Sequence, residues 1–195
     1  MSDLLVTDIG CLVTNEVSID GTPLGIIHDA AFAVTDGKVS WVGANESAPT
    51  SEKTIDAAGK AVIPGFVDSH NHLIFAADRS AEFSARMSGQ KYSAGGITST
   101  VTQTRAASDS DLLSNANRLV HEGLHSGTTT VEIKSGYGLT VKDEVRSLKI
   151  ASELTQETTF LGAHVVPVEY KEAADDYVEL VCNQMLTDVR PYAKW

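Results

Sequence analysis

Residues 64–75, PGFVDSHNHLIF, place two histidines one residue apart at the end of an apolar run. In a β-strand, alternate side chains point to the same face, so His70 and His72 should project together while Asn71 points away. Two neighbouring imidazoles can bind one metal ion, but the spacing alone fits a structural or solvated pair about equally well. Asp68 precedes His70 by two residues and is expected either to orient an imidazole or to cap the end of the strand.

Outward from this stretch, strand-like runs alternate with amphipathic runs. The expected strands cover residues 60–68, 128–136 and 158–166, and the expected helices cover residues 108–125, 141–154 and 169–186. An irregular segment follows the first strand and includes residues 93–101, whose two glycines suit a loop close to a ligand. Such repeats build an open doubly wound α/β sheet or a (β/α)8 barrel, and three units do not decide between them. Both folds place active sites at the carboxyl ends of their strands, where the two histidines lie.

The chain before residue 60 has a different pattern. Residues 30–44 contain two β-type runs around Thr35-Asp36-Gly37-Lys38, which predicts a β-hairpin. We therefore expect a small β unit over residues 1–60 and an α/β domain over residues 61–195.

Composition and charge exclude several classes of function. The 195 residues are 42% hydrophobic and carry a formal net charge of −11, so nucleic acids and anionic membranes would be repelled over most of the surface. We expect a small-molecule ligand, and an anionic ligand would need a local positive group. Cys11 and Cys182 form neither a disulfide framework nor a CxxC site, which favours a reducing cytoplasm. No apolar run reaches the roughly 20 residues of a membrane span.

Longer segments around the histidines carry a family resemblance. Residues 55–75, IDAAGKAVIPGFVDSHNHLIF, resemble the signature of the amidohydrolase superfamily, an Asp-x-x-Gly lead followed by Pro-Gly-Phe and Asp-x-His-x-His. Further blocks are similar to the imidazolonepropionase family within it: HLIFAADRSAEFSARMSGQKY (72–92), STVTQTRAAS (99–108), VEIKSGYGL (131–139) and TTFLGAHVVP (158–167). The resemblance implies the first part of a TIM-type (β/α)8 barrel, preceded by a portion of a small β-sandwich.

The resemblance also implies a reaction. Members of this family open the ring C–N bond of 4-imidazolone-5-propionate with a metal-activated water molecule, giving N-formimidoyl-L-glutamate in histidine degradation. The implied cofactor is one divalent or ferric metal ion, zinc or iron. The implied partner is the small anionic substrate, with no nucleic acid or membrane, and a homodimer is one assembly that the resemblance allows.

Residue roles follow from the matching positions. His70 and His72 would be metal ligands, and Arg79 would hold the propionate carboxylate of the substrate. Tyr137 would bind substrate, and His164 would contact substrate near the metal and take part in catalysis. Without the resemblance, Arg79 would be interpreted as a surface ion pair, Tyr137 as a loop aromatic and His164 as structural.

The remaining candidate residues have plainer interpretations. Some amidohydrolases use a strand-end lysine to bridge two metals, but Lys134 shares a strand face with Glu132, which favours an internal ion pair. His28 is predicted to be non-catalytic. His121 and His125 are four residues apart on a helix, a spacing that can bind metal but here indicates the solvent side.

The chain departs from the family pattern in length. A third metal-binding histidine and an aspartate that serves as ligand and general base would belong to a second half of the barrel. We therefore expect a fragment of a larger protein, or a functional half that assembles with another chain, and an inactive module is a third interpretation. Another amidohydrolase activity, such as deamination of a heterocycle, is the alternative. Exposed strand edges would favour association.

Overall fold

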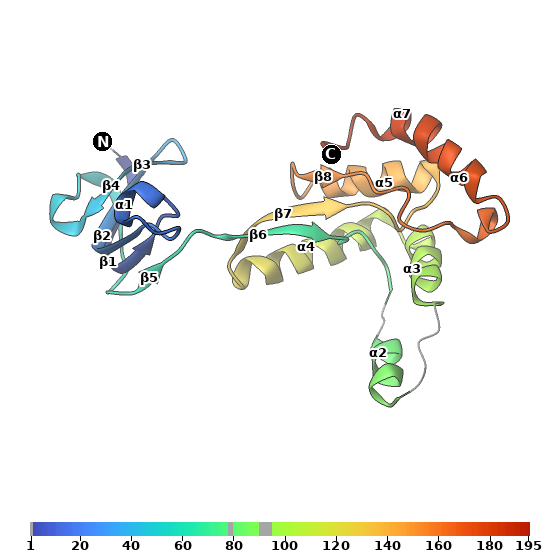
Figure 1. Cartoon of the computed structure of the whole chain (residues 1–195), viewed down its shortest axis with the longest axis horizontal. Coiled ribbons are helices and arrows are strands. Elements are labelled where there is room, and N and C mark those ends of the chain that lie inside the picture. The colour runs from blue at the N-terminus through green and yellow to red at the C-terminus, as the bar shows by residue number, and fades with distance from the viewer. Residues whose placement is uncertain (1, 78–79, 90–94) are drawn as a thin grey trace. The chain divides into compact units, whose positions relative to one another are not determined.

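A computed structural model describes residues 2–77, 80–89 and 95–195 of the chain (Figure 1). The chain divides into two compact units, Met1–Gly65 and Phe66–Trp195. Among the described residues, no helix combines the length and the apolar character that crossing a membrane requires.

The first unit is a small sheet. Its elements are β1 (Ser2–Val13), α1 (Val17–Asp20), β2 (Ile26–Thr35), β3 (Lys38–Ala44), a 3-10 turn (Asn45–Ser47), β4 (Ser51–Asp56) and β5 (Ala61–Val62). The strand order is β3-β2-β1-β4, and β5 pairs with β1. Strands β2 and β3 form the predicted hairpin, in which Asp36 and Gly37 have φ values of 51° and 71°. Two consecutive positive φ values are what a type I′ turn requires.

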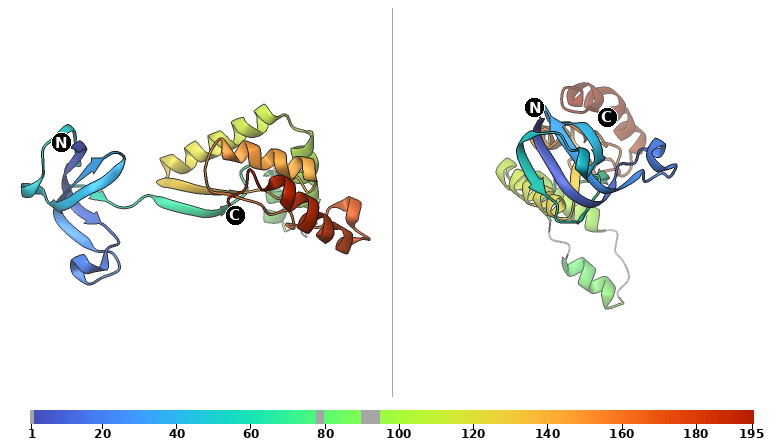
Figure 2. Two further views of the ribbon diagram at one scale, coloured as in Figure 1. Left: turned by 90° about the horizontal axis from the view of Figure 1, so that it is seen from above. Right: turned by 90° about the vertical axis from the view of Figure 1, so that its left-hand side faces the viewer.

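The second unit is built on a parallel sheet in the order β6-β7-β8. Its elements are β6 (Phe66–Asn71), α2 (Ser80–Met87), α3 (Gly95–Ala106), α4 (Asp109–His125), β7 (Thr128–Lys134), α5 (Val141–Ser152), β8 (Thr158–Thr159), a 3-10 turn (Val168–Tyr170), α6 (Ala174–Leu180), a π-helical turn (Val181–Met185) and α7 (Leu186–Val189). Helices α4 and α5 lie side by side along the sheet (Figures 1 and 2). Ile133 of β7 shares a buried cluster with Leu112 of α4 and Ile150 of α5. The helices therefore cover the face toward which Ile133 points, and β7 presents its alternate side chains to the other face.

Helices α4 and α5 begin where the sequence predicts. The Ser108 hydroxyl accepts a hydrogen bond from the backbone N–H of Asp111 at 3.1 Å, and Thr140 accepts one from Asp143 at 3.1 Å. Each side chain thus satisfies an N–H that has no partner inside its helix. The predicted apolar face of α4 is buried at Leu112 and Ala116.

The single strand predicted at residues 60–68 is wrong. Ala61–Val62 pair with Cys11 and Leu12 in the first unit, whereas β6 starts at Phe66 and pairs with β7 in the second unit. Pro64 lies between the two strands and has no N–H to donate to a ladder, which breaks the apolar run into two elements.

The strand predicted at residues 158–166 is also shorter than expected. Only Thr158 and Thr159 pair with β7, opposite Ile133 and Lys134. After Thr159 the backbone leaves the sheet: the N–H of Phe160 bonds the carbonyl of Trp195 at 2.9 Å. The chain then turns, so the apolar residues that follow pack outside a strand.

Two predicted boundaries around helices need correction. The loop expected at residues 93–101 is helical from Gly95 onward. Thr100 and Val101 are β-branched and have low helix propensity, but both are buried, and the packing of their side chains outweighs this propensity. The third predicted helix begins at Ala174 rather than at Glu169 and passes through a π-helical turn before α7.

Candidate active site

Three histidines and a tyrosine lie together in the second unit. The rings of His72 and His164 are stacked, with centroids 4.5 Å apart and planes at 7°. The Tyr137 ring lies 5.2 Å from His72 and 5.3 Å from His164, and the His70 ring meets His72 edge-on at 5.7 Å. The structure thus brings together four of the predicted site residues. The fifth, Arg79, lies outside the described residues.

The parallel sheet explains why these side chains meet. His70 lies near the end of β6 and His72 directly follows that strand, Tyr137 follows β7, and His164 follows β8. Since β6, β7 and β8 run parallel, their carboxyl ends share one edge of the sheet. His70 and His72 also project together, as the period of two predicts.

A close backbone approach holds His164 against the loop after β7. Gly136 has a φ of 117°, and a Cβ built there would lie 2.9 Å from the carbonyl oxygen of Leu161 and 3.0 Å from Cβ of His164. Only glycine fits this position without displacement. The Nδ1 of His164 lies 3.0 Å from the Gly136 carbonyl, so Nδ1–H donates this hydrogen bond. Neutral His164 therefore keeps an unprotonated Nε2.

His72 is held in its neutral form. Its pKa is lowered from 6.5 to about 4, chiefly by burial and also by repulsion from His164, His70 and Lys134, while a hydrogen bond with the backbone of Ser135 acts in the opposite direction. At neutral pH the imidazole is therefore uncharged, which is the form that binds metal ions. Its Nδ1 is buried and has no hydrogen-bond partner among the described residues.

The donor set fits a metal ion in part. His70 and His72 present adjacent imidazoles, and the unpartnered Nδ1 of His72 is a buried polar atom that a bound ion would satisfy. Within the described ranges, however, no group of three or more His, Cys, Asp or Glu side chains is arranged to hold a metal. Two ligands are fewer than zinc or iron takes from a protein, so further ligands are needed.

Asp68 caps the end of β6. One carboxylate oxygen accepts the backbone N–H of His70 at 3.2 Å, and the other accepts the side-chain amide of Asn71 at 2.9 Å. Both contacts stay within the strand end. The cap, rather than orientation of an imidazole, is the role that these contacts support.

Lys134 forms the ion pair that the strand alternation predicts. Its Nζ lies 2.6 Å from Oε1 of Glu132, and the two side chains are only 15% and 12% exposed. The lysine is thus engaged by a carboxylate. His121 and His125 are exposed on α4, as expected.

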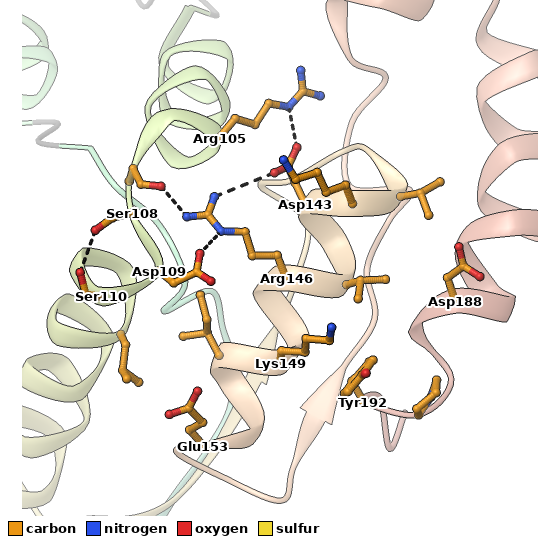
Figure 3. Close-up of a pocket in the computed structure, with 17 residues that line it drawn as sticks. Arg105, Ser108, Asp109, Ser110, Asp143, Arg146, Lys149, Glu153, Asp188 and Tyr192 are labelled. Atoms are coloured by element: carbon orange, nitrogen blue, oxygen red, sulfur yellow. Dashed lines mark hydrogen bonds and ion pairs between the residues drawn. The ribbon is translucent and has the colours of Figure 1, made fainter.

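A large cavity in the second unit lies away from these rings. A cavity of about 1030 Å³ between α4, α5 and the C-terminal residues is lined by Arg146, Asp109 and Asp143, among others (Figure 3). Arg146 pairs with Asp109 and also lies 3.9 Å from a carboxylate oxygen of Asp143. None of the four clustered rings lines this cavity. Arg146 is thus engaged by carboxylates of the protein, and the histidine cluster remains the candidate site.

Sequence reasoning missed Glu144, Arg105 and Phe75. Glu144 is fully buried in α5, Arg105 donates to the carbonyl of Gly138, and the Phe75 ring lies 6.5 Å from Tyr137. The signal for Glu144 was its helical spacing from Leu148 and Ala151, which places it on the buried face of α5.

Comparisons with known proteins identify similar families and folds. Residues 53–138 match the amidohydrolase family. A mutant atrazine chlorohydrolase from Arthrobacter aurescens, solved with zinc and atraton, aligns with a TM-score of 0.57 and 18% identity over 92% of this chain and 43% of that one. A triazine hydrolase variant gives a TM-score of 0.58 and 17% identity over 94% and 43%. At this identity the two structures show a shared fold.

Sequence relatives are much more similar. An imidazolonepropionase from Mycolicibacterium smegmatis is 60% identical over 195 residues, which are 100% of this chain and 49% of that protein. The corresponding protein from Salinispora tropica is also 60% identical over 195 residues, 100% of this chain and 50% of the relative. The chain spans about half the length of these relatives. Along its whole length, the chain is thus similar to about half of each of these imidazolonepropionases.

Proposed function

We propose that this chain supplies part of the active site of a hydrolase that opens the ring C–N bond of 4-imidazolone-5-propionate, giving N-formimidoyl-L-glutamate in histidine degradation. The observation that carries the proposal is the convergence of His70, His72, Tyr137 and His164 at the ends of three parallel strands. Relatives that are 60% identical over the whole chain bear the name of that enzyme.

The fold proposal is that β6, β7 and β8 form the first wall of a TIM-type (β/α)8 barrel. Parallel strands with α4 and α5 on one face are the arrangement that a barrel wall uses, with helices outside and active-site residues at the carboxyl ends. In this proposal the first unit is a portion of a β-sandwich.

The proposed cofactor is one zinc or iron ion held by His70 and His72. One fold neighbour was solved with zinc. When bound, such an ion supplies Lewis-acid chemistry and lowers the pKa of a coordinated water molecule. The neutral state of His72 suits this role, and the remaining ligands would come from groups other than those described for this chain.

The protein's own side chains have separate proposed tasks. His164, whose Nδ1–H donates to the Gly136 carbonyl, can take up a proton at Nε2 and then donate a hydrogen bond to the oxyanion that develops on the ring carbonyl. The Tyr137 ring lies tilted beside His72 and His164 and can orient the substrate ring. Arg79 is proposed to bind the propionate carboxylate in a bidentate manner.

The setting of the proposed enzyme follows from charge and cysteines. A net charge of −11 makes a local arginine necessary for an anionic substrate. Both cysteines, Cys11 and Cys182, are free thiols, which supports the proposal of a reducing cytoplasm. A homodimer is the proposed assembly.

A metal-loaded assay tests the function. A protein of the relatives' full length that contains this chain, supplied with zinc or ferrous iron, is incubated with 4-imidazolone-5-propionate, and formation of N-formimidoyl-L-glutamate is measured. Turnover that His70→Ala abolishes and that His121→Ala leaves unchanged is the expected result, since His121 is exposed on α4. Ammonia release from guanine-like heterocycles alone would establish the deaminase alternative. Absence of both reactions, with metal bound, would contradict the proposed function.

A further inference from the structure

The loop between β7 and α5, residues 135–140, positions the Tyr137 ring. It has an irregular backbone, because Gly136 has a φ of 117° and Leu139 has a φ of 55°. Leu139 is nevertheless only 2% exposed. A non-glycine residue in this conformation persists only where its surroundings hold it there.

Glu144 is the first restraint on this loop. Its side chain is fully buried in the first turn of α5. Its Oε1 accepts the backbone N–H of Gly138 at 3.0 Å and that of Leu139 at 2.6 Å. One carboxylate oxygen therefore ties down both residues that follow Tyr137.

Arg105 of α3 is the second restraint. Its Nε donates to the carbonyl oxygen of Gly138 at 2.7 Å. The guanidinium also pairs with Glu169 and lies 4.0 Å from a carboxylate oxygen of Asp143, and Figure 3 shows it pointing toward Asp143. Gly138 is thus fixed at its N–H by Glu144 and at its C=O by Arg105.

Space around Gly138 is also restricted. A Cβ at this residue would lie 2.5 Å from the carbonyl carbon of Asp143 and 2.7 Å from the backbone nitrogen of Glu144. The loop therefore lies directly on the start of α5. On the other side of Tyr137, Gly136 is held by the hydrogen bond from His164. Both neighbours of Tyr137 are fixed, which leaves its ring few positions.

We propose that Glu144 and Arg105 are positioning residues: by clamping the peptide groups of Gly138 and Leu139, they hold the Tyr137 ring beside His72 and His164. The significance for substrate recognition rests on the proposed function, in which Tyr137 orients the imidazolone ring. The clamp itself is a property of this chain. Among the described residues, neither side chain forms a hydrogen bond or ion pair with the clustered rings, so both act through the loop backbone.

Burial of the Glu144 carboxylate is consistent with a role in holding the loop at residues 135–140. Loss of water around Glu144 raises the pKa of its carboxyl group, while hydrogen bonds from Ser135, Leu139, Gly138 and Gly136 lower it. A buried acid that served only to fill space would be better replaced by an apolar side chain. Here its acceptor oxygen satisfies two backbone donors that otherwise have no helix or strand partner.

The test uses four variants of the chain and no activity measurement. Glu144→Ala removes the acceptor, Glu144→Gln keeps one acceptor oxygen, and Arg105→Met removes the donor to Gly138. Glu153→Ala is the matched control, because Glu153 lies at the other end of α5 and is exposed. Amide hydrogen exchange at Gly138 and Leu139, and NMR shifts of the Tyr137 ring, are recorded for each variant.

In Glu144→Ala, exchange at Gly138 and Leu139 should accelerate about tenfold or more, while amides in α4 stay within about twofold of the parent chain. The ring resonances of Tyr137 should shift, because the ring-current effects of His72 and His164 depend on its position. Glu144→Gln should recover toward the parent values, and Arg105→Met should shift the Tyr137 ring as well. A role in stability alone would lower the melting temperature without moving native-state ring shifts.

Parent-like exchange and ring shifts in folded Glu144→Ala and Arg105→Met would overturn the proposal. If Glu144→Ala does not fold, Glu144→Gln and Arg105→Met decide: parent-like values in both overturn it, and altered values in Arg105→Met support it. Amide exchange and Tyr137 ring shifts can be measured even if the ring-opening assay shows no activity. The positioning role of Glu144 and Arg105 is therefore tested independently of the proposed function.

Discussion

Replacement of Gly136 by alanine tests the close approach on which the candidate site depends. Forcing alanine to a φ of 117° costs about 1–3 kcal/mol. The added Cβ would lie 2.9 Å from the Leu161 carbonyl oxygen and 3.0 Å from Cβ of His164, so backbone must move and the hydrogen bond from His164, worth about 1 kcal/mol, is strained or lost. We expect the free energy of unfolding to fall by about 2–4 kcal/mol in total.

Gly123→Ala is the matched control for this change. Gly123 lies within α4, where a Cβ would meet only Cβ of Thr128 at 3.7 Å, an ordinary contact. Alanine in a helix interior is favoured over glycine by about 0.5–1 kcal/mol, so this variant should be stabilised. Urea titrations followed by far-ultraviolet circular dichroism measure both values. A loss below about 0.5 kcal/mol in Gly136→Ala would refute the strain argument.

Three further predictions follow from burial and charge. Relative to the parent chain, Glu144→Gln should raise the free energy of unfolding more at pH 7 than at pH 4.5. Because the pKa of Glu144 is raised in the folded state, the folded parent binds more protons than the unfolded parent and loses stability as pH rises above the pKa of Glu144 in the unfolded chain. Urea titrations across this pH range check the sign. Lys134→Met should cost about 1–3 kcal/mol, because it leaves the 12%-exposed Glu132 without its partner; an unchanged unfolding midpoint would contradict a net role for the pair. Val67→Lys should reduce self-association measured by sedimentation, because Val67 is 65% exposed on the edge strand β6; equal association of both chains would exclude this edge as the contact.

Local chemistry made part of the fold predictable from sequence. The alternation at His70 and His72, the starts of α4 and α5, and the turn at Asp36 each depend on a few neighbouring residues. Such features follow from backbone geometry that every chain shares. The positions of the clustered rings could be anticipated because parallel strands end at one edge of a sheet.

Long-range packing made the rest unpredictable. The sequence of residues 60–68 does not indicate that its two halves pair with different sheets. Strand pairing depends on contacts with residues far away in the sequence, here β1 for Ala61–Val62 and β7 for β6. Helix α3 contains many β-branched residues, and its helical state depends on burial of Val101 beside Leu139 and Tyr177. The helical spacing of Glu144 from Leu148 and Ala151 indicates burial, but the sequence does not indicate that its carboxylate binds the backbone of Gly138.

The candidate site is therefore more than three strand ends. His164 lies five residues after β8 ends at Thr159, so the strand does not fix its ring. Its position depends on Gly136, whose carbonyl it binds and whose missing side chain leaves room for it. Gly136 and Gly138 flank Tyr137, and each is held by a side chain from a different element. The sheet brings the three loops to one edge, and these contacts between loop backbone and side chain set the geometry of the rings.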